Sequence, residues 1–246
     1  MAGLRVAVIG AEGRMGRTVC DAVEKADDLE LVARLDVGDD IGDLAGAADV
    51  GVDFTVPDAA EANVHALLDA GMHAVVGTTG WHDDALQRVR DRLADTPLGV
   101  VVAPNFALSA VLAMRFAAQA ARWFDSVEVV ELHHPEKVDA PSGTAIHTAR
   151  AIAAARREAD VPPGPDATTS GLAGARGASV DGVPVHAVRL RGLVAHEEIL
   201  LGNPGELLTI RTDSFDRSSF MPGVLLAVRR VVHRRGLTLG LDALLD

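Results

Sequence analysis

The sequence predicts an α/β protein: a Rossmann-like parallel-sheet domain joined to a smaller α+β domain that contains a mixed sheet. A short apolar run, Leu4–Ile9, leads directly into a glycine-rich turn, as a buried parallel strand does in nucleotide-binding folds. Apolar runs then alternate with helical segments as far as residue 106, which is typical of a parallel sheet with helical crossovers. Shorter alternating runs after residue 106 indicate a different, mixed or antiparallel sheet.

The elements of the first domain follow from this alternation. We expect a helix from the glycine turn to about Ala26, and further helices and strands where apolar periodicity changes between 3.6 and 2. The expected strands are Leu4–Ile9, Leu29–Leu35, Val50–Phe54, His73–Val76 and Gly99–Ala103, and the other two helices are Asp58–Ala70 and Asp83–Ala94.

The second half predicts helices over Ser109–Phe124, from near Ser142, and over Ser218–Arg234, with strands over Val127–Leu132, Val185–Leu190, Glu198–Leu201, Leu207–Arg211 and Leu237–Leu239. The segment Val161–Pro184 is rich in Gly, Pro, Ser and Thr and is expected to form a long surface excursion. The last helix and strand can return to complete the first sheet. We therefore expect a discontinuous dinucleotide-binding domain, 1–106 plus 217–246, and a substrate-binding domain, 107–216.

The glycine turn is a variant of the dinucleotide fingerprint. Residues 10–16 read G-A-E-G-R-M-G between a strand and a helix, and the next strand ends at Asp36. Glycines let the backbone approach a pyrophosphate, and the helix start supplies free N–H groups. Asp36 can accept hydrogen bonds from the adenosine ribose and repel a 2′-phosphate. With Glu12 adding negative charge and Arg14 expected as the one nearby basic group, NADH should bind at least as well as NADPH.

Two more loops fall at strand carboxyl ends, where ligands of open α/β sheets bind. Gly77-Thr78-Thr79 follows one expected strand, and Ala103-Pro104-Asn105-Phe106 follows another. Each alone reads equally well as a plain turn. Together they are candidates to line the nicotinamide and its ribose.

The densest chemistry lies in the stretch E-L-H-H-P-E-K-V-D-A-P-S-G-T-A, residues 131–145. His133, His134 and Lys137 precede small residues at the expected helix start, Ser142 to Thr144, where N–H groups and hydroxyls can hold a carboxylate. N-capping by Ser142 explains part of this pattern but neither the His pair nor Lys137. Only Lys25 and Lys137 are lysines in a chain that otherwise uses Arg, which favours a proton-yielding role for Lys137. A zinc site has little support, because no Cys and no H-x-x-x-H accompanies the His pair.

Composition excludes several function classes. A net charge of −12 with 3% aromatic residues and no Tyr argues against nucleic-acid binding. The longest apolar stretch, Leu98–Met114, contains Pro104, Asn105 and Ser109, so we expect no membrane span. The single cysteine, Cys20, cannot form an internal disulfide, which fits the cytoplasm.

In this order, the motifs G-A-E-G-R-M-G, G-T-T-G, A-P-N-F, E-L-H-H-P-E-K-V-D-A-P-S-G-T-A and R-L-R-G-L-V-A-H-E resemble those of the dihydrodipicolinate reductase family over essentially the whole chain. The resemblance implies an NADH- or NADPH-dependent reductase of the lysine and diaminopimelate pathway. Its reaction converts 4-hydroxy-tetrahydrodipicolinate to tetrahydrodipicolinate. It also implies hinge closure between the domains and a homotetramer built through the substrate domain. Glu12 departs from relatives that often have a basic residue there, which argues against strong NADPH use.

Specific residues take roles from this resemblance. His133 is expected to be the proton donor and acceptor and Lys137 a proton donor. The substrate dicarboxylate is expected to contact His134, Ser142, Gly143 and Thr144. The cofactor site is expected to comprise Gly10, Ala11, Glu12, Gly13, Arg14, Met15, Asp36, Gly77, Thr78, Thr79, Ala103, Pro104, Asn105 and Phe106.

Two rival functions stay open at this point. A related two-domain oxidoreductase such as aspartate-semialdehyde dehydrogenase needs a Cys nucleophile in the substrate half, whereas Cys20 lies in the first half. A non-catalytic dinucleotide sensor needs neither His133 nor Lys137 beside an anion cradle. It should bind nucleotide and show no affinity for a pyridine-2,6-dicarboxylate.

Overall fold

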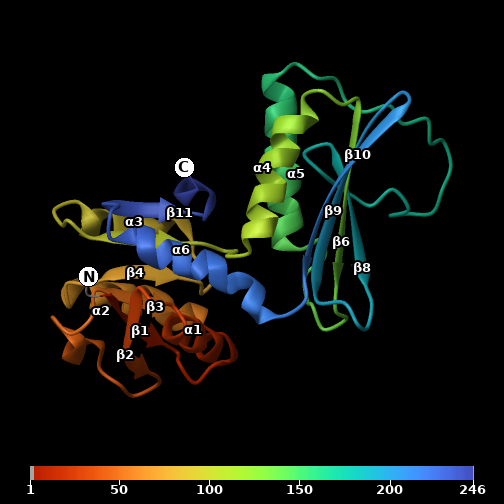
Figure 1. Cartoon of the computed structure of the whole chain (residues 1–246). Coiled ribbons are helices and arrows are strands. Elements are labelled where there is room, and N and C mark those ends of the chain that lie inside the picture. The colour runs from red at the N-terminus through yellow and green to blue at the C-terminus, as the bar shows by residue number, and fades with distance from the viewer. Residues whose placement is uncertain (1–2, 246) are drawn as a thin grey trace. The chain divides into compact units, whose positions relative to one another are not determined.

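The computed structural model describes residues 3–245, which form two compact units (Figure 1). Of the described residues, unit 1 comprises 3–108 and 217–245, and unit 2 comprises 109–216. The first unit contains a parallel sheet and the second a mixed sheet, so the predicted α/β fold class is confirmed.

Unit 1 is built on a six-stranded sheet in the order β11-β5-β4-β3-β1-β2. Every neighbouring pair in that sheet is parallel. The strands are β1 Leu4–Ile9, β2 Leu29–Leu35, β3 Val50–Asp53, β4 His73–Val76, β5 Gly99–Val102 and β11 Gly236–Leu239. The helices are α1 Arg14–Glu24, α2 Pro57–Asp69, α3 Asp83–Leu93 and α6 Met221–Val231, with 3-10 turns at Ile41–Leu44, Arg217–Phe220 and Asp242–Leu244.

The central strands of this sheet are short and are buried on both faces. All four residues of β3 and all four of β5 are buried, as the unbroken apolar runs of covered parallel strands require. Side chains of β1, β4 and β5 pack with apolar residues of α2 and α3 in one core cluster, which includes Val64, Leu67 and Val89. Because these strands are parallel, the loops after β1, β3, β4 and β5 all lie at the carboxyl ends of the strands, on one side of the sheet.

The chain returns to this sheet at its C-terminal end. Strand β11 pairs in parallel with β5, as the sequence suggested. The expected helix over Ser218–Arg234 is shorter, because a 3-10 turn precedes it and α6 begins at Met221. Pro222 sets that start, since proline lacks an N–H and fits only the first turn of a helix.

Unit 2 packs two long helices on one face of a five-stranded sheet (Figure 1). The helices are α4 Leu108–Ala121 and α5 Gly143–Glu158. The strand order is β10-β9-β6-β8-β7, and only the β6–β8 pair is parallel. The strands are β6 Ser126–His133, β7 Ala178–Val180, β8 Val183–Arg189, β9 Ala195–Asn203 and β10 Glu206–Ser214.

The predicted excursion over Val161–Pro184 is wrong at its C-terminal end. Residues 178–180 form β7, and β8 begins at Val183, so both belong to the sheet. A two-residue Asp181-Gly182 turn with φ of 49° and 88° joins them. Asp-Gly is the preferred pair for a tight hairpin turn, so the signal was present. Strands β9 and β10 are also longer than expected, at nine residues each.

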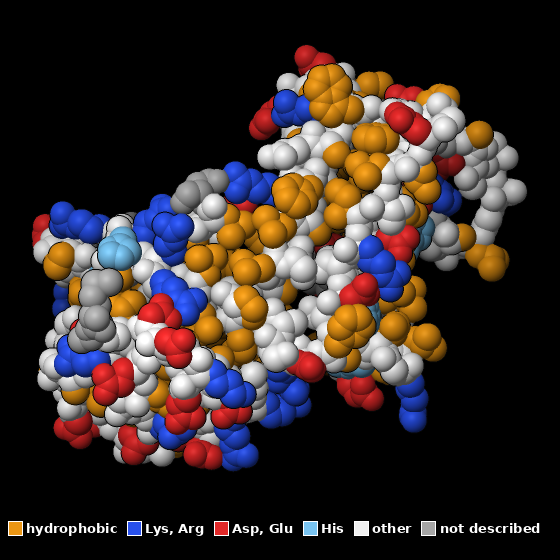
Figure 2. Space-filling model, in the orientation of Figure 1, with side chains coloured by type: hydrophobic (Ala, Val, Ile, Leu, Met, Phe, Trp, Pro, Cys, Tyr) orange, Lys and Arg blue, Asp and Glu red, His pale blue; other side chains and the backbone are white. Residues whose placement is uncertain are grey.

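One face of α4 is apolar and exposed. Apolar side chains gather over this helix in Figure 2, and Phe116 on α4 and Trp123 directly after it are largely exposed. No helix within the described residues combines the length and apolarity needed to cross a membrane.

Candidate active site

The glycine turn after β1 has the close approaches that a dinucleotide loop needs. Gly10 has a φ of +78°, which favours glycine. A Cβ on Gly16 would lie 2.0 Å from the carbonyl oxygen of Gly10. The tightest contact of Gly16 is thus with the loop itself. No side chain caps α1 at Gly13, so the helix start fits a pyrophosphate.

A cavity of about 440 Å³ in unit 1 lies beside this loop. It is lined by Ile9, Gly10, Gly13, Leu35, Asp36, Val37, Gly38, Asp39, Ile41, Phe54, Thr55, Val56, Ala59 and Asn63. The Asp36 carboxylate accepts hydrogen bonds of 2.8 Å from the N–H groups of Val37 and Glu12. These bonds hold the pKa of Asp36 below its usual range, so the carboxylate is charged and can accept a diol. The position of this cavity beside the glycine turn, together with the Asp36 carboxylate, fits the adenosine half of a dinucleotide.

The charge around this loop differs from our expectation in one respect. Arg14 is not the one nearby basic group, because the Arg17 guanidinium lies 2.8 Å from the Glu12 carboxylate. Arg17 follows Gly13 by one turn of α1, which places its side chain back over the loop. Glu12 is therefore partly neutralised, and a positive group stands near Asp36.

A buried carboxylate that sequence reasoning missed fixes the loop after β4. Asp53 is fully buried at the end of β3 and accepts hydrogen bonds from Thr78 Oγ1 at 2.6 Å and Asn63 Nδ2 at 2.7 Å. The Thr78 hydroxyl thus acts as a hydrogen-bond donor to Asp53. A Cβ on Gly77 would lie 2.0 Å from the Phe54 ring, so this loop also makes a close approach to β3. Thr79 lines a separate cavity with Trp81.

The residues after β5 divide between core and surface. Ala103 and Phe106 are buried, and the Phe106 ring lies 5.7 Å from the Phe54 ring. Pro104 is exposed, and Asn105 Oδ1 accepts a 2.8 Å hydrogen bond from Ala107 N–H. Within this loop, Pro104 and Asn105 are thus better placed than Phe106 to meet a ligand.

Cys20 is a packed core thiol in α1. Burial raises its pKa, which lowers the thiolate fraction that a nucleophile needs. A Cys-dependent dehydrogenase reaction has no support at this position.

In unit 2, His133 ends strand β6 and carries a carboxylate partner. Its Nδ1 lies 2.7 Å from Glu131 Oε2, so Nδ1–H donates to Glu131 and Nε2 is left to face a ligand. Burial lowers the pKa of His133 below its ordinary value, against the raising effect of Glu131. The strand ends between His133 and His134, so strand alternation does not decide the direction of His134.

Glu131 is buried, with 1% of its surface exposed, and it is the centre of a network that sequence reasoning missed. Arg189 donates to both carboxylate oxygens at 2.7 and 2.8 Å, and Ser142 N–H donates at 3.0 Å. Burial alone would raise the pKa of Glu131, but the hydrogen bonds from Arg189 and His133 hold it below its ordinary value. Arg189 on β8 pairs in register with His133 on β6.

The loop after β6 positions the ammonium group. Lys137 Nζ lies 2.7 Å from Asp139 Oδ1, and the Lys137 side chain is mostly buried. His134 Nδ1 donates to Glu136 Oε2 at 3.1 Å and is more exposed. Lys137 N–H donates to His134 O at 3.3 Å, so a tight turn separates the imidazole pair from the ammonium.

The start of α5 is capped as expected. Ser142 Oγ accepts a 3.2 Å hydrogen bond from Ala145 N–H, and its own N–H is used by Glu131. Gly143 N–H lies 3.3 Å from Asp139 Oδ2. The main-chain N–H groups of Ser142 and Gly143 are therefore both engaged within the protein. Gly143 and Thr144 begin the helix.

A second buried carboxylate lies beside Glu131 on the neighbouring strand. Glu197 on β9 is directly opposite Glu131 in the antiparallel register and is 5% exposed. Its Oε2 accepts a 3.1 Å hydrogen bond from Thr148 Oγ1 on α5. Burial raises the pKa of Glu197 to about 7, so this side chain is half-protonated near neutrality.

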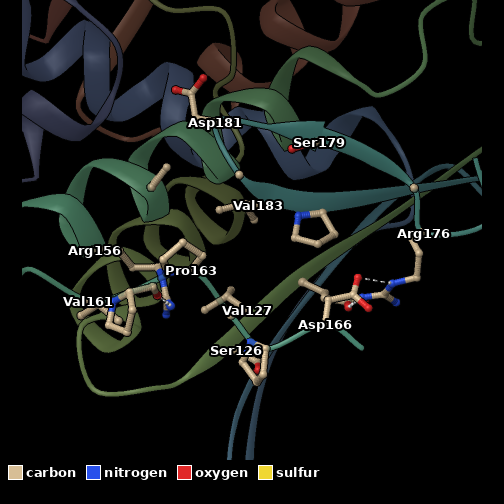
Figure 3. A pocket seen from close by; sticks show the side chains of 18 of the residues that line it. Ser126, Val127, Arg156, Val161, Pro163, Asp166, Arg176, Ser179, Asp181 and Val183 are labelled. Atoms are coloured by element: carbon tan, nitrogen blue, oxygen red, sulfur yellow. Dashed lines mark hydrogen bonds and ion pairs between the residues drawn. The ribbon is translucent and has the colours of Figure 1, made fainter. Parts of the chain in front are cut away.

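Unit 2 also contains a cavity of about 490 Å³, which is separate from the residues around His133 (Figure 3). Its lining includes Arg156, Pro163, Asp166 and Arg176, with Arg176 Nε 3.4 Å from Asp166. None of the site residues proposed from the sequence lines it. The candidate site in this unit is therefore the surface around His133, Lys137 and the start of α5.

Two family profiles divide the chain between them. The profile for the N-terminal part of dihydrodipicolinate reductase matches residues 4–106, and the profile for its C-terminal part matches residues 109–245. The chain belongs to the dihydrodipicolinate reductase family. It is thus an NAD(P)-dependent oxidoreductase, and the resemblance noted in the sequence is confirmed.

Individual relatives agree with this membership. The chain is 72% identical to the 4-hydroxy-tetrahydrodipicolinate reductase of Beutenbergia cavernae over 99% of both chains. Identity to the reductase of Streptomyces griseus is 60%, over 100% of this chain and 99% of the relative. A solved dihydrodipicolinate reductase from Paenisporosarcina with dipicolinate bound is 37% identical, with a TM-score of 0.88 over 99% of this chain and 100% of that one.

Proposed function

We propose that this chain reduces 4-hydroxy-tetrahydrodipicolinate to tetrahydrodipicolinate with NADH or NADPH, in lysine and diaminopimelate biosynthesis in the cytoplasm. The observation that supports it most is the set of groups around the start of α5. An imidazole paired with a buried carboxylate, an ammonium group and a helix start lie on adjacent segments of unit 2. Relatives named for this reaction match almost the whole chain.

The chemistry of the reaction needs these groups. Reduction of the substrate consumes one hydride and one proton and releases one water, so a proton donor is required beside the ring. The bound nicotinamide would supply the hydride. His133 is the proposed proton donor, because Glu131 fixes Nδ1 and leaves Nε2 for exchange. Lys137 is the proposed second donor, and its ammonium also attracts the substrate anion.

Binding of the dicarboxylate is proposed to use the start of α5. Gly143 and Thr144 stand at the positive end of the helix dipole. His134 is proposed to contact the second carboxylate. Ser142 is proposed to act mainly through its cap of the helix, because Ala145 and Glu131 take up its hydroxyl and N–H.

The dinucleotide is proposed to lie along the glycine loop of unit 1. Residues 10–15 would hold the pyrophosphate, and Asp36 would accept the ribose diol. Thr79, Pro104 and Asn105 would face the nicotinamide half, while Gly77, Thr78, Ala103 and Phe106 would shape the loops that hold it. We propose that NADH serves at least as well as NADPH, although Arg17 lessens the penalty for a 2′-phosphate.

We propose a homotetramer joined through unit 2. Strand β10 is an edge strand that exposes Leu207 and Leu208, and α4 exposes Phe116. Large exposed apolar side chains on neighbouring elements favour an interface between copies. Light scattering should give about four times 25.7 kDa; a monomer mass would contradict the assembly.

Two variants test the catalytic assignment. We expect His133→Ala to lower kcat by about 100-fold or more, as loss of a general acid does, with little change in KM. Thr144→Val should mainly raise KM. His65→Ala, which removes another glutamate-paired imidazole, should leave both constants unchanged. An unchanged kcat in His133→Ala would refute the acid assignment.

Calorimetry separates the reductase from a dinucleotide sensor. A reductase should bind a pyridine-2,6-dicarboxylate through unit 2, and Lys137→Met should weaken that binding. A protein that binds NADH and shows no affinity for the dicarboxylate would be a sensor.

A further inference from the structure

Glu131 is a buried carboxylate with no direct part in the proposed reaction, yet four donors converge on it. Oε2 accepts from His133 Nδ1 and from one Arg189 nitrogen, each at 2.7 Å. Oε1 accepts from the other Arg189 nitrogen at 2.8 Å and from Ser142 N–H at 3.0 Å. Both oxygens are thus fully used within unit 2.

We propose that Glu131, held by Arg189, is a positioning residue that fixes the His133 ring and the start of α5 as one unit. The proposal rests on the proposed function, in which His133 gives a proton to the substrate. Glu131 itself has no contact with the reacting atoms in this account.

Glu131 decides which nitrogen of the His133 imidazole carries the proton. Either ring nitrogen of a histidine can carry the proton, and the partner of one nitrogen decides the state of the other. Because the Glu131 carboxylate accepts only, it keeps a proton on Nδ1 of His133. Nε2 is then the nitrogen that gives and takes a proton. The same carboxylate stabilises the imidazolium that must form before donation.

Arg189 extends this network to the rest of the candidate site. Arg189 also donates to the carbonyl oxygen of Asp139 at 2.7 Å, and the Asp139 carboxylate holds Lys137 and Gly143 N–H. Glu131 reaches the same helix start through Ser142 N–H. The Glu131–Arg189 pair therefore connects the His133 imidazole, the loop that carries Lys137 and the start of α5.

The charges that face His133 come from several elements. Glu131 on β6 raises the proton affinity of the ring, whereas Lys137 and Arg189 lower it. Glu197 on β9 faces Glu131 across the register. Removing Glu131 would therefore leave the imidazole beside two cations without the carboxylate that raises its proton affinity, although Asp139 would still pair with Lys137.

The test uses two variants and a matched control. Glu131→Gln removes the charge, and Glu131→Gln with Arg189→Gln removes it without leaving a buried guanidinium unpaired. Glu128→Gln is the control, since Glu128 on the same strand also pairs with a histidine, His186, and an arginine, Arg176. Each protein is measured for urea stability, for kcat against pH, and for the His133 titration by NMR, assigned with His133→Ala.

If Glu131 is a positioning residue, the two variants should differ in stability but share the same change in the His133 pKa. We expect the double variant to recover much of the stability that Glu131→Gln loses. The pKa of His133 and the falling alkaline limb of kcat should stay at least about one pH unit lower in both variants. Glu128→Gln should cost stability without moving that limb. Recovery of the limb together with stability, or an unmoved His133 titration, would overturn the proposal.

The titration separates this proposal from the proposed function. If the wild-type protein reduces no substrate, the reductase assignment fails. The NMR shift of His133 in the variants still decides whether Glu131 sets the state of the ring.

Discussion

Glu197→Gln should stabilise the folded protein at alkaline pH and leave it nearly unchanged in acid. Glu197 is 5% exposed and its carboxylate accepts one hydrogen bond, from Thr148. Within the described residues Oε1 has no hydrogen-bond partner. Ionising such a group in the fold is costly, and burial raises its pKa to about 7.

The sign and size of the effect follow from proton linkage. Below pH 4.5, the ordinary value for Glu, both states hold the proton and there is no cost. As the pH rises from 4.5 to about 7, only the unfolded chain ionises, so stability falls. Above pH 7 the loss is complete, at about 3 kcal/mol for this difference in pKa.

The assay is urea unfolding of wild type and Glu197→Gln at pH 5, 6, 7 and 8. The variant should gain about 2.5 kcal/mol on wild type between pH 5 and pH 8, because a small part of the loss is already present at pH 5. Glu198→Gln is the control, because Glu198 is the next residue on β9 and pairs with Arg211 at 2.9 Å. Its difference from wild type should change little over this range. A Glu197→Gln difference that is constant with pH would refute the reasoning.

Three further variants test other parts of the fold. Gly16→Ala should weaken NADH binding several-fold and cost about 1–3 kcal/mol of stability, because its Cβ would meet the Gly10 carbonyl at 2.0 Å; Gly171→Ala, with open space around it, should change neither fluorescence-monitored binding nor urea unfolding. Glu12→Gln should lower the KM for NADPH by about fivefold and leave the KM for NADH unchanged, because it frees Arg17; equal changes in both constants would contradict this. Arg156→Met should cost about 3 kcal/mol in urea, since the buried guanidinium serves the carbonyls of Ala121, Asp125 and Pro162; a loss below 1 kcal/mol would argue against that role.

Local pattern was sufficient where one short segment decides the structure. The bounds of β1, β2 and β4 agree with the sequence prediction, because each is an apolar run between turn signals. The cap at Ser142 also agrees. Strands β9 and β10 were predicted too short because their polar ends are stabilised by each other along nine paired positions, which no single run reveals.

The candidate site residues are predicted from local motifs, whereas the contacts that support them are not. His133, Lys137 and Gly143 lie within eleven residues of one another, so one short segment carries that prediction. Arg189 reaches Glu131 from 58 residues away. Contacts of that separation depend on strand order, which a single sequence does not show.

Glu197 and Asp53 were missed for a related reason. Both are acidic side chains on strands, and sequence alone favours a solvent-facing position for either. Their burial depends on how the strands and loops pack in the fold. Glu197 pairs in register with Glu131, and Asp53 accepts a hydrogen bond from Thr78 on the loop after β4. An acidic residue that ends an otherwise apolar strand was the signal available for Asp53.

The central claim is tested most directly by nucleotide oxidation with the cyclic substrate made in situ by its upstream synthase, with NADH and NADPH side by side. We expect rapid loss of reduced-nucleotide absorbance that depends on the synthase, with NADH at least as effective as NADPH. No loss with either nucleotide, from folded protein that still binds NADH, would contradict the reductase assignment.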